Sequence, residues 1–292
     1  MLTNFPNGLT SFGIPLIGNG LPLRLNATYY FVDGTNGSDG NSGTEPALAF
    51  ATIEKAISVV NTKINWTATR WATTDVIVIA PGVYAENLTS LPYGAVLYGC
   101  GYDNRDAQNG VKIKPESGAP VDVDSVINTE FYNIGFETAD TTAGHRVFDA
   151  TIINNCTFVN CRFEGPAETA TAVGVYTSDA TRSKWINCEI ACCDKGFQVE
   201  YADADDGFNH CLLDGCIITQ CDTAGIYLSA NLVGPSSVAR NCFIGGSGQT
   251  MTKGIDDNSG VLDEAFNAIE ATTAVEGVRS SNGSYGNGTL LT

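Results

Sequence analysis

The chain has 292 residues, of which 15 are Lys or Arg and 32 are Asp or Glu, giving a formal net charge of −17 at pH 7. This excess of negative charge argues against binding to phosphate backbones or anionic lipid, so we expect neither nucleic acid nor a membrane among its partners. Hydrophobic residues make up 43% of the chain and charged residues 16%, which is typical of a folded globular protein and not of a disordered one.

Residues 1–28 are predicted to form an extended arm, because Pro6, Pro15 and Pro22 suit neither a helix nor a central strand. The arm also carries many apolar side chains, which indicates that it lies on another surface. Two alternatives are open: the arm attaches to a neighbouring copy or a different protein, or it packs back on its own domain. Residues 1–20 lack a basic stretch followed by an apolar one, so we expect no cleaved export signal and thiols that start reduced.

Residues 29–74 hold a short strand signal, a turn-rich loop and a helix. The strand signal covers residues 29–33, and Gly, Asn, Asp and Ser dominate the loop that follows. Thr52 is a suitable N-cap for a helix over residues 50–60, whose apolar residues recur at helical spacing. These apolar positions are Ile53, Ala56, Ile57 and Val60.

A repeat of about 27 residues organises the rest of the chain. An Asn/Gly-Cys-x-apolar pattern recurs at Cys161, Cys188, Cys216 and Cys242, which are 27, 28 and 26 residues apart. A second marker advances at a similar step and consists of Gly174, Gly196, Gly225 and Gly254. A unit this short cannot bury its apolar face alone and must stack on its neighbours. We therefore predict an all-β parallel β-helix of about six or seven coils over residues 75–260.

Alternation along each strand places Cys161 and Phe163 inside the β-helix and Arg162 outside. The inward cysteines are expected to form vertical stacks, because a small, soft side chain fills a narrow interior without polar cost. Disulfides or a reactive thiol are the alternative, which parallel Cβ vectors disfavour. The further cysteines that follow the same step are Cys156, Cys193, Cys211 and Cys221.

Three segments carry a family resemblance. They are Tyr-Phe-Val-Asp-Gly-Thr-Asn-Gly from residue 30, Phe-Ala-Thr-Ile-Glu-Lys-Ala-Ile from residue 50, and Asp-Val-Ile-Val-Ile-Ala-Pro-Gly-Val-Tyr from residue 75. In this order and spacing they resemble the opening of right-handed β-helix proteins of the pectate-lyase-like superfamily. The resemblance implies a right-handed β-helix whose first coil is covered by the helix at 50–60. The superfamily includes polysaccharide lyases, hydrolases, phage tailspikes and virion proteins without known chemistry, so the fold does not choose the function.

The arm carries a second resemblance. Its segments Thr-Asn-Phe-Pro-Asn-Gly from residue 3 and Ser-Phe-Gly-Ile-Pro from residue 11 are similar to the openings of some tailed-phage virion proteins. This resemblance implies that the arm is an attachment device, with the major capsid protein or another virion protein as its partner.

The cations of the repeat do not form a lyase site. A carbohydrate lyase of this fold would need an Arg or Lys base beside a cluster of Ca²⁺ ligands, and the cations here occur singly. We expect each of them to make a solvated salt bridge instead. They are Arg162, Lys184, Lys195 and Arg240.

One acidic stretch is the candidate for a hydrolase site, which needs two carboxyl groups about 5 to 9.5 Å apart. A run this acidic within a loop is more typical of a solvated turn or a weak cation site, and we favour that interpretation. The stretch contains Glu200, Asp203, Asp205 and Asp206, and Glu189 and Asp214 are available on neighbouring strands or coils.

The remaining candidates have structural alternatives. His145 and His210, the two histidines, lie in no nucleophile or metal signature and are interpreted as incidental. Residues 33–43 lack the spacing and final Glu of a Ca²⁺ loop, so we favour turn formation there. Four aromatic residues could line a sugar-binding surface, although capping or packing is the commoner role of such rings. They are Trp66, Trp71, Trp185 and Tyr201.

The end of the chain, residues 261–292, changes character. Leu262, Phe266 and Ile269 fall at helical spacing, which predicts a closing helix or turn, followed by a tail. Assembly as a homotrimer is a further hypothesis, with the uncharged outward residues Ile217 and Phe243 at the contact.

The interpretation that we favour is a structural protein of a tailed-phage virion, in the role of a capsid decoration or cement protein attached through its arm. We assign no catalytic, cofactor-binding or metal-binding residue, and we favour a role without enzymatic activity. The alternative is a tailspike-like or receptor-binding β-helix that binds or cleaves host surface polysaccharide.

Overall fold

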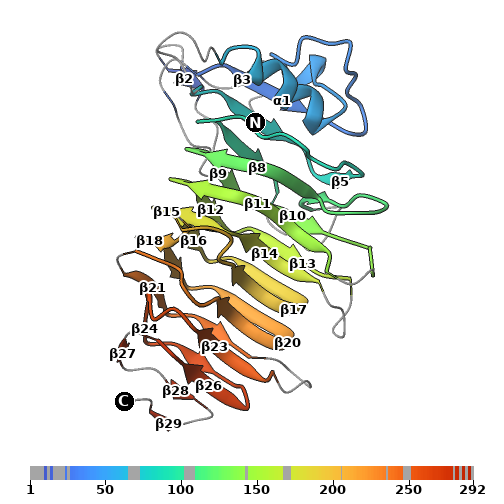
Figure 1. Cartoon of the computed structure of the whole chain (residues 1–292). Helices are drawn as coiled ribbons and strands as arrows, with labels where there is room; N and C mark the ends of the chain where they lie inside the picture. The colour runs from blue at the N-terminus through green and yellow to red at the C-terminus, as the bar shows by residue number, and fades with distance from the viewer. Residues whose placement is uncertain are drawn as a thin grey trace.

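The computed structural model describes residues 10–11, 14–15, 24, 27–64, 73–101, 109–141, 144–166, 172–204, 206–234, 236–245, 251–278, 280–282, 285–286 and 289–290. Of residues 10–15 and 280–290 only the backbone is described. The strands stack above one another into a column, with the first residues of the fold at one end and the last at the other (Figure 1). Within the described part, no helix is long and apolar enough to cross a membrane.

The first face of the column is a ten-stranded sheet in which every pairing is parallel. Each coil contributes one strand to it, so strands that are far apart in the chain lie side by side. The strands, from top to bottom of the column, are β3 (Tyr29–Val32), β4 (Val76–Ile79), β6 (Val96–Gly99), β9 (Glu130–Tyr132), β12 (Thr157–Val159), β16 (Lys184–Ile186), β19 (Leu212–Asp214), β21 (Ser237–Arg240), β24 (Leu262–Ala265) and β27 (Ser280–Asn282).

The second and third faces belong to one 17-stranded sheet that bends around the column. The second face contains β5 (Gly82–Tyr84), β7 (Val111–Ile113), β10 (Ile134–Glu137), β13 (Arg162–Glu164), β22 (Phe243–Ile244), β25 (Ala268–Ile269), β28 (Tyr285–Gly286) and β29 (Thr289–Leu290). The third face contains β8 (Val121–Ile127), β11 (Arg146–Asn154), β14 (Val173–Thr177), β15 (Asp179–Thr181), β18 (Phe208–Asn209), β23 (Lys253–Asp257) and β26 (Thr273–Glu276). Two long strands, β17 (Glu189–Val199) and β20 (Ile217–Leu228), run through both faces. The predicted all-β parallel β-helix is confirmed.

A helix closes the upper end, as predicted. Helix α1 (Ile53–Asn61) begins after Thr52, whose hydroxyl accepts a hydrogen bond from Lys55 N at 3.1 Å. The carboxylate of Glu86 accepts two more from Ile53 N at 2.9 Å and Glu54 N at 2.8 Å. These acceptors satisfy backbone donors that a helix start leaves unpaired. The four apolar residues predicted for one helical face, Ile53, Ala56, Ile57 and Val60, are fully buried against the first coil.

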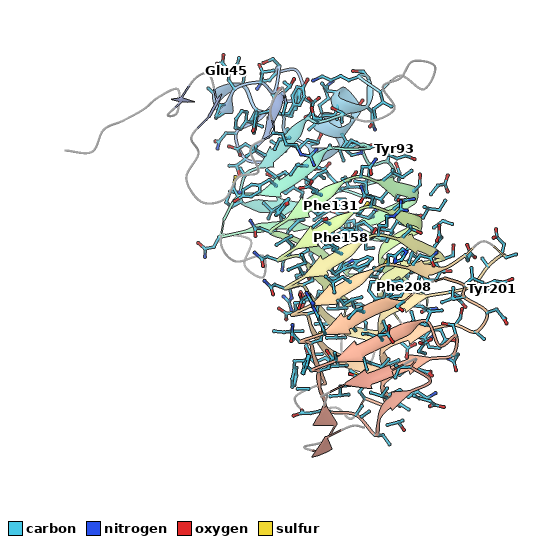
Figure 2. The ribbon with its side chains drawn as sticks, turned by 90° about the vertical axis from the view of Figure 1, so that its left-hand side faces the viewer. Glu45, Tyr93, Phe131, Phe158, Tyr201 and Phe208 are labelled. Atoms are coloured by element: carbon cyan, nitrogen blue, oxygen red, sulfur yellow. The ribbon has the colours of Figure 1, made fainter. Side chains whose placement is uncertain are left out.

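The interior holds two contrasting files of side chains. Phe131, Phe158 and Trp185 point inward from the first face and stack with ring centroids 4.7 and 5.4 Å apart; two of these rings are labelled in Figure 2. The second face contributes the predicted cysteine stack, because Arg162 pairs with Glu189, and Glu189 with Ile217, which aligns the cysteines just before them. Cys161, Cys188, Cys216 and Cys242 are all at most 2% exposed.

The recurring Asn or Gly of the repeat forms the turn between the first and second faces. The turn residue adopts a positive φ, a conformation that Asn and Gly tolerate better than other residues. Successive amides also bond along the column, as from Asn160 Nδ2 to Asn133 Oδ1 at 3.2 Å. The file of turn residues is Asn133, Asn160, Asn187, Gly215, Asn241 and Phe266.

The closing helix predicted after residue 260 is wrong. The segment forms β24 and β25, which extend the column by another coil beyond the predicted limit of 260. Leu262 and Ile269 are buried on two different strands, and Phe266 is the positive-φ turn residue between them, 62% exposed. The helical spacing of the three residues is therefore a coincidence, because Leu262 lies on one strand, Phe266 in the turn and Ile269 on the next strand.

The lower end of the predicted arm packs on the chain's own β-helix. Arg24 donates from Nη1 to the carbonyl of Gly94 and from Nη2 to Glu130 Oε1, the latter at 2.5 Å. Ala27 packs beside the buried outward side chains of Val76 and Val96. At these two residues the second alternative for the arm holds, and most of residues 1–23 lie outside the described part.

Candidate functional site

The third face carries a continuous file of polar and aromatic side chains on its outer side. Parallel pairing aligns one residue from each coil, and the neighbours along each strand, such as Phe148, Val175 and Phe197, are fully buried inside. We call this file the ladder. Its members are Asp122, Asp149, Tyr176, Gln198, Tyr227, Asp256 and Glu276.

Cations lie beside the ladder and contact it from the coil above. Arg146 places its guanidinium 3.2 Å from the centre of the Tyr176 ring, and Lys195 lies 4.6 Å from the centre of the Tyr227 ring. Both are cation–π contacts, and they fix the orientation of the tyrosines. Lys253 repeats the arrangement with carboxylates, at 3.0 Å from Asp256 and 2.9 Å from Glu276. Arg146 and Lys253 therefore each connect two successive rungs, while Lys195 contacts one.

Burial changes the ionisation of the upper rungs. It raises the pKa of Asp149 above its ordinary value, although Arg146 Nη1, at 2.9 Å from both carboxylate oxygens, opposes the rise. Burial also raises the pKa of the Tyr176 and Tyr227 phenols. The phenols are therefore neutral hydroxyl groups at physiological pH, able to donate and accept hydrogen bonds.

The centre of the ladder is Gln198, which is 5% exposed and lies between the two tyrosine rungs. Its Nε2 donates to Glu200 Oε2 at 2.8 Å. Glu200, a member of the predicted acidic stretch, is thus brought to the ladder. Strand spacing of about 4.8 Å puts the two tyrosines roughly 10 Å apart, with an amide and a carboxylate between them.

The rest of the predicted acidic stretch is dispersed. Asp206 Oδ2 accepts hydrogen bonds from the backbone of Ala202 and Asp203 at 2.5 and 2.7 Å, which makes it a loop-forming residue. Glu189 lies on the second face, 3.6 Å from Arg162, and Asp214 lies on the first face, 2.7 Å from Arg240. Asp205 lies outside the described residues. Of the described candidate carboxylates, Glu189 and Asp214 therefore lie on different faces, and Asp206 is engaged by the backbone of its own loop.

The other predicted candidates are also placed. Lys184 is exposed on the first face, His145 Nε2 lies 3.0 Å from Asp140, and His210 is a positive-φ turn residue. In the 33–43 loop, Asp33 Oδ1 accepts hydrogen bonds from the backbone N–H groups of Thr35 and Asn36, which is the arrangement of a turn. Trp185 is fully buried, and Tyr201 packs against the core at the side of the column (Figure 2). Trp66 and Trp71 lie outside the described residues.

Among the described residues, no group of three or more His, Cys, Asp or Glu is placed to hold a metal ion. All ten cysteines are free thiols. Burial raises the pKa of Cys156, Cys211 and Cys221 to about 12, so these thiols stay protonated and unreactive at neutral pH. The interpretation as packing residues is consistent with both observations.

The sequence analysis missed the ladder, although a signal for it was present. The second marker of the repeat places the rungs two residues after a glycine, as in Gly174-Val-Tyr176, Gly196-Phe-Gln198 and Gly225-Ile-Tyr227. A Cβ at Gly196 would come within 2.6 Å of Ile218 Cγ2 and 2.7 Å of the Gly225 carbonyl, so close packing explains the glycine. No single residue type occupies all the rungs, so the file is not visible as a repeat in the sequence.

Comparisons with solved structures show distant likeness. Pectin methylesterase PemA from Erwinia chrysanthemi is 14% identical over 91% of both chains, with a TM-score of 0.47. The Dettilon tailspike protein (gp208) is 14% identical over 83% of this chain and 50% of its own, with a TM-score of 0.40.

The family comparison covers more than half of the chain. No curated protein sequence matches. A family model described as a right handed beta helix region matches residues 97–271, from within β6 to just beyond β25. This match supports the right-handedness that the family resemblance implied. The chain belongs to the right-handed β-helix family.

Proposed function

We propose that the protein binds an extended neutral polysaccharide along the ladder. The observation that carries this proposal is the register of the third face, which lines up tyrosines and carboxylates in one file on its outer side, with the largely buried Gln198 amide between the tyrosines. Aromatic rings offer flat apolar faces to sugar rings, while amide and carboxylate oxygens accept hydrogen bonds from hydroxyl groups. A file that repeats with every coil suits a ligand that itself repeats.

The charges of the ladder select against an acidic polymer. Four rungs are carboxylates, and each of the three flanking cations is already engaged by a rung, Arg146 by Asp149 and Tyr176, Lys195 by Tyr227, and Lys253 by Asp256 and Glu276. A polyuronate would bring further negative charge to this surface, and like charges at short range repel. A neutral glycan avoids that cost.

In biological terms, we propose that this binding serves recognition of host surface polysaccharide by a tailed-phage particle. The support is the resemblance of the arm to virion proteins together with the ladder, which a purely architectural shell protein does not need. Capsid decoration through the arm, contact with the major capsid protein and a homotrimer through Ile217 and Phe243 stay predictions. Both residues are outward, in register, and 43% and 37% exposed.

The test is a binding measurement with neutral and acidic polysaccharides by affinity electrophoresis and calorimetry. Replacing Tyr176 and Tyr227 together by Ala should weaken binding to a neutral polymer about a hundredfold, since each ring is worth roughly tenfold. The matched control replaces Tyr98 and Tyr132, outward tyrosines of the first face whose rings lie 6.2 Å apart. Equal losses in both double variants, or preference for a polyuronate, would refute the proposal. Assaying the same mixtures for new reducing ends shows whether cleavage accompanies binding.

A further inference from the structure

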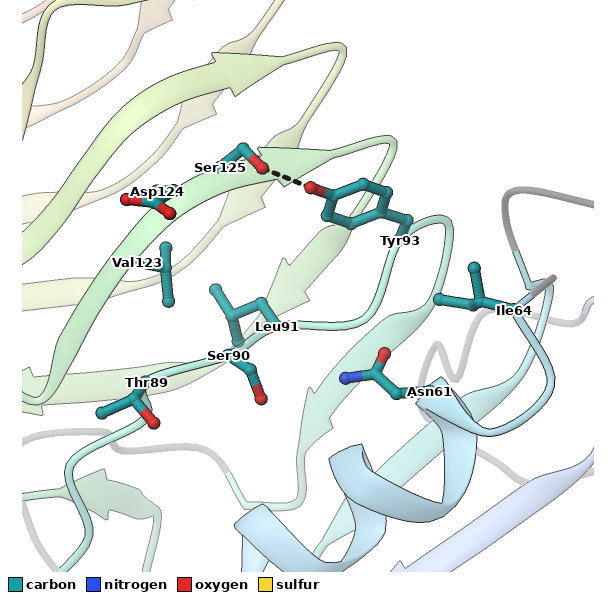
Figure 3. A pocket seen from close by; sticks show the side chains of 9 residues that line it. All are labelled: Asn61, Ile64, Thr89, Ser90, Leu91, Tyr93, Val123, Asp124 and Ser125. Carbon is teal, nitrogen blue, oxygen red and sulfur yellow. Dashed lines mark hydrogen bonds between the residues drawn. The ribbon is translucent and has the colours of Figure 1, made fainter. Parts of the chain in front are cut away.

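A pocket lies at the upper end of the ladder, between the last turn of α1, the segment after Leu88 and strand β8 (Figure 3). Its volume is about 340 Å³. Nine residues line it: Asn61, Ile64, Thr89, Ser90, Leu91, Tyr93, Val123, Asp124 and Ser125. None of the sequence motifs singled it out, because its walls come from three separate segments of the chain.

The pocket is continuous with the ladder. Leu88 pairs in parallel with Val121, and Asp122 N donates to the Leu88 carbonyl at 3.1 Å. By that register Thr89 lies beside Asp122 and is the next position of the ladder file, one coil higher. Asp124 follows two residues later on the same strand, with its side chain on the same face. A ligand that follows the ladder upward therefore arrives in the pocket.

The upper end of this path is closed. Asn61, the last residue of α1, forms the wall opposite β8 (Figure 3). The helix itself is fixed in place by four fully buried apolar residues and by the carboxylate of Glu86 at its start. A polymer chain on the ladder can run down the column, but α1 stands where its next residue above the pocket would lie.

The lining suits a single neutral sugar. Hydroxyl groups of Thr89, Ser90, Tyr93 and Ser125 surround an apolar floor that includes the buried Leu91 and Val123. Asp124 adds an exposed carboxylate, and no Lys, Arg or His is among the lining residues. A carboxylate accepts strong hydrogen bonds from hydroxyl groups and repels another carboxylate, so the chemistry selects polyols over uronic acids.

One wall group lacks a partner. The Oδ1 atom of Asn61 is buried and accepts no hydrogen bond from the described part of the chain. Tyr93 and Ser125, by contrast, satisfy each other with the hydrogen bond drawn in Figure 3. A buried oxygen without a donor costs free energy, and a ligand hydroxyl can remove that cost by donating to the amide once the Asn61 side chain rotates toward the pocket.

We infer that this pocket is an end subsite, which holds the terminal residue of a neutral glycan whose following residues lie on the ladder. The inference rests on the proposed function, and it adds that the protein recognises the ends of chains and not their interior. Recognition of ends limits the number of binding positions on each polymer to its termini, whatever its length.

The experiment uses saturation-transfer NMR of the full chain with six neutral monosaccharides: glucose, galactose, mannose, rhamnose, N-acetylglucosamine and N-acetylgalactosamine. Galacturonic acid serves as the acidic comparison. At least one neutral sugar should give a signal that Ser90→Trp abolishes. Ser90 is exposed and lines the pocket, so an indole ring at this position should fill the pocket without disturbing the core. Asp124→Asn should weaken binding about tenfold through loss of charge-assisted hydrogen bonds.

Two control variants separate this inference from the ladder. Thr35→Trp adds the same ring at an exposed turn elsewhere and should leave the signal unchanged. The Tyr176→Ala/Tyr227→Ala variant should keep monosaccharide binding while losing the polymer. Absence of any neutral signal, survival of the signal in Ser90→Trp, or equal binding of galacturonic acid overturns the end subsite and leaves polymer binding by the ladder intact. If a monosaccharide binds in the pocket but the Tyr176→Ala/Tyr227→Ala variant keeps its affinity for the polymer, the end subsite is supported and polymer binding by the ladder is refuted.

Discussion

The upper and lower halves of the column share one backbone repeat but are filled in different ways. The inward file of the first face begins above with Tyr30, Ile77 and Leu97. It continues to the middle of the column as Phe131, Phe158 and Trp185, whose rings stack in parallel. The same file continues below as Leu213, Ala239 and Glu264, so the side chains shrink and then become polar. Strand register therefore determines the coil, while the inward side chains can change from stacked aromatic rings to hydrogen-bonded polar groups.

The lower half replaces apolar volume with buried polar contacts. Asp257, 1% exposed, accepts hydrogen bonds from Ser259 N, Ser259 Oγ, Gly260 N and Leu262 N at 2.7 to 3.0 Å. Asn267 occupies the position that cysteines hold above, and its Nδ2 donates to Glu264 Oε2 at 2.9 Å. Stability there depends on complete pairing of polar groups, since a buried one without a partner is expensive.

The largest expected effect is in the aromatic file. Trp185→Ala should lower the free energy of unfolding by about 3–5 kcal/mol, because it leaves a large cavity in a fully buried stack. Denaturant unfolding followed by circular dichroism measures it. Trp185→Phe is the matched control and should cost far less, since the ring stack persists and the change removes the indole Nε1, which has no hydrogen-bond partner among the described residues. Equal losses in the two variants would contradict the role of the stacked rings.

In the lower half, Asp257→Ala should lower the free energy of unfolding by about 2–3 kcal/mol, because several buried backbone donors lose a charged acceptor together. The exposed Asp122→Ala is the control and should change stability by less than about 0.5 kcal/mol. A small effect at Asp257 would show that packing and not hydrogen bonding maintains the lower coils.

The outer second face gives a pH-dependent test of the upper half. Burial alone would raise the pKa of Glu137, but Lys112 and Lys114 hold it below its ordinary value of 4.5. Its contribution to stability is therefore present above pH 4.5 and lost as the pH falls through the lowered pKa. Glu137→Gln should cost about 1–2 kcal/mol at pH 7 and progressively less as the pH falls below 4.5. A difference that does not vary with pH would rule out the ion pairs as its cause.

The smallest effect has the opposite sign. Phe266 occupies the turn position that Asn holds in most coils above, with a φ of 56° and 62% exposure. Phe266→Asn should raise the free energy of unfolding by about 1 kcal/mol, because Asn tolerates this conformation better. Asn160→Phe is the reciprocal change and should destabilise by a similar amount. Destabilisation by Phe266→Asn would indicate that the exposed ring makes a contact worth more than the strain.

The sequence was sufficient to predict the β-helix because Cys161, Cys188, Cys216 and Cys242 keep one residue type at one step. Where residue types change, prediction failed. Phe266 and Asn267 occupy the positions that Asn241 and Cys242 hold one coil earlier. The repeat is therefore not recognisable there, and the segment that contains β24 and β25 was predicted as a helix. The ladder was missed for the same reason, since Gln198 separates Tyr176 from Tyr227 and no one residue type recurs from coil to coil. The pocket depends on three segments meeting, which no local pattern reports.

The two ends of the column also affect whether further copies of the chain can add to it edge to edge. An exposed strand edge is a template on which a second chain can add, and repeated addition produces fibres. Here α1 covers the upper edge with its buried apolar face, while at the lower end β29 turns back antiparallel on β28. Within the described chain, the upper opening and the lower edge of β28 are therefore covered, which hinders the addition of a second copy at these two places.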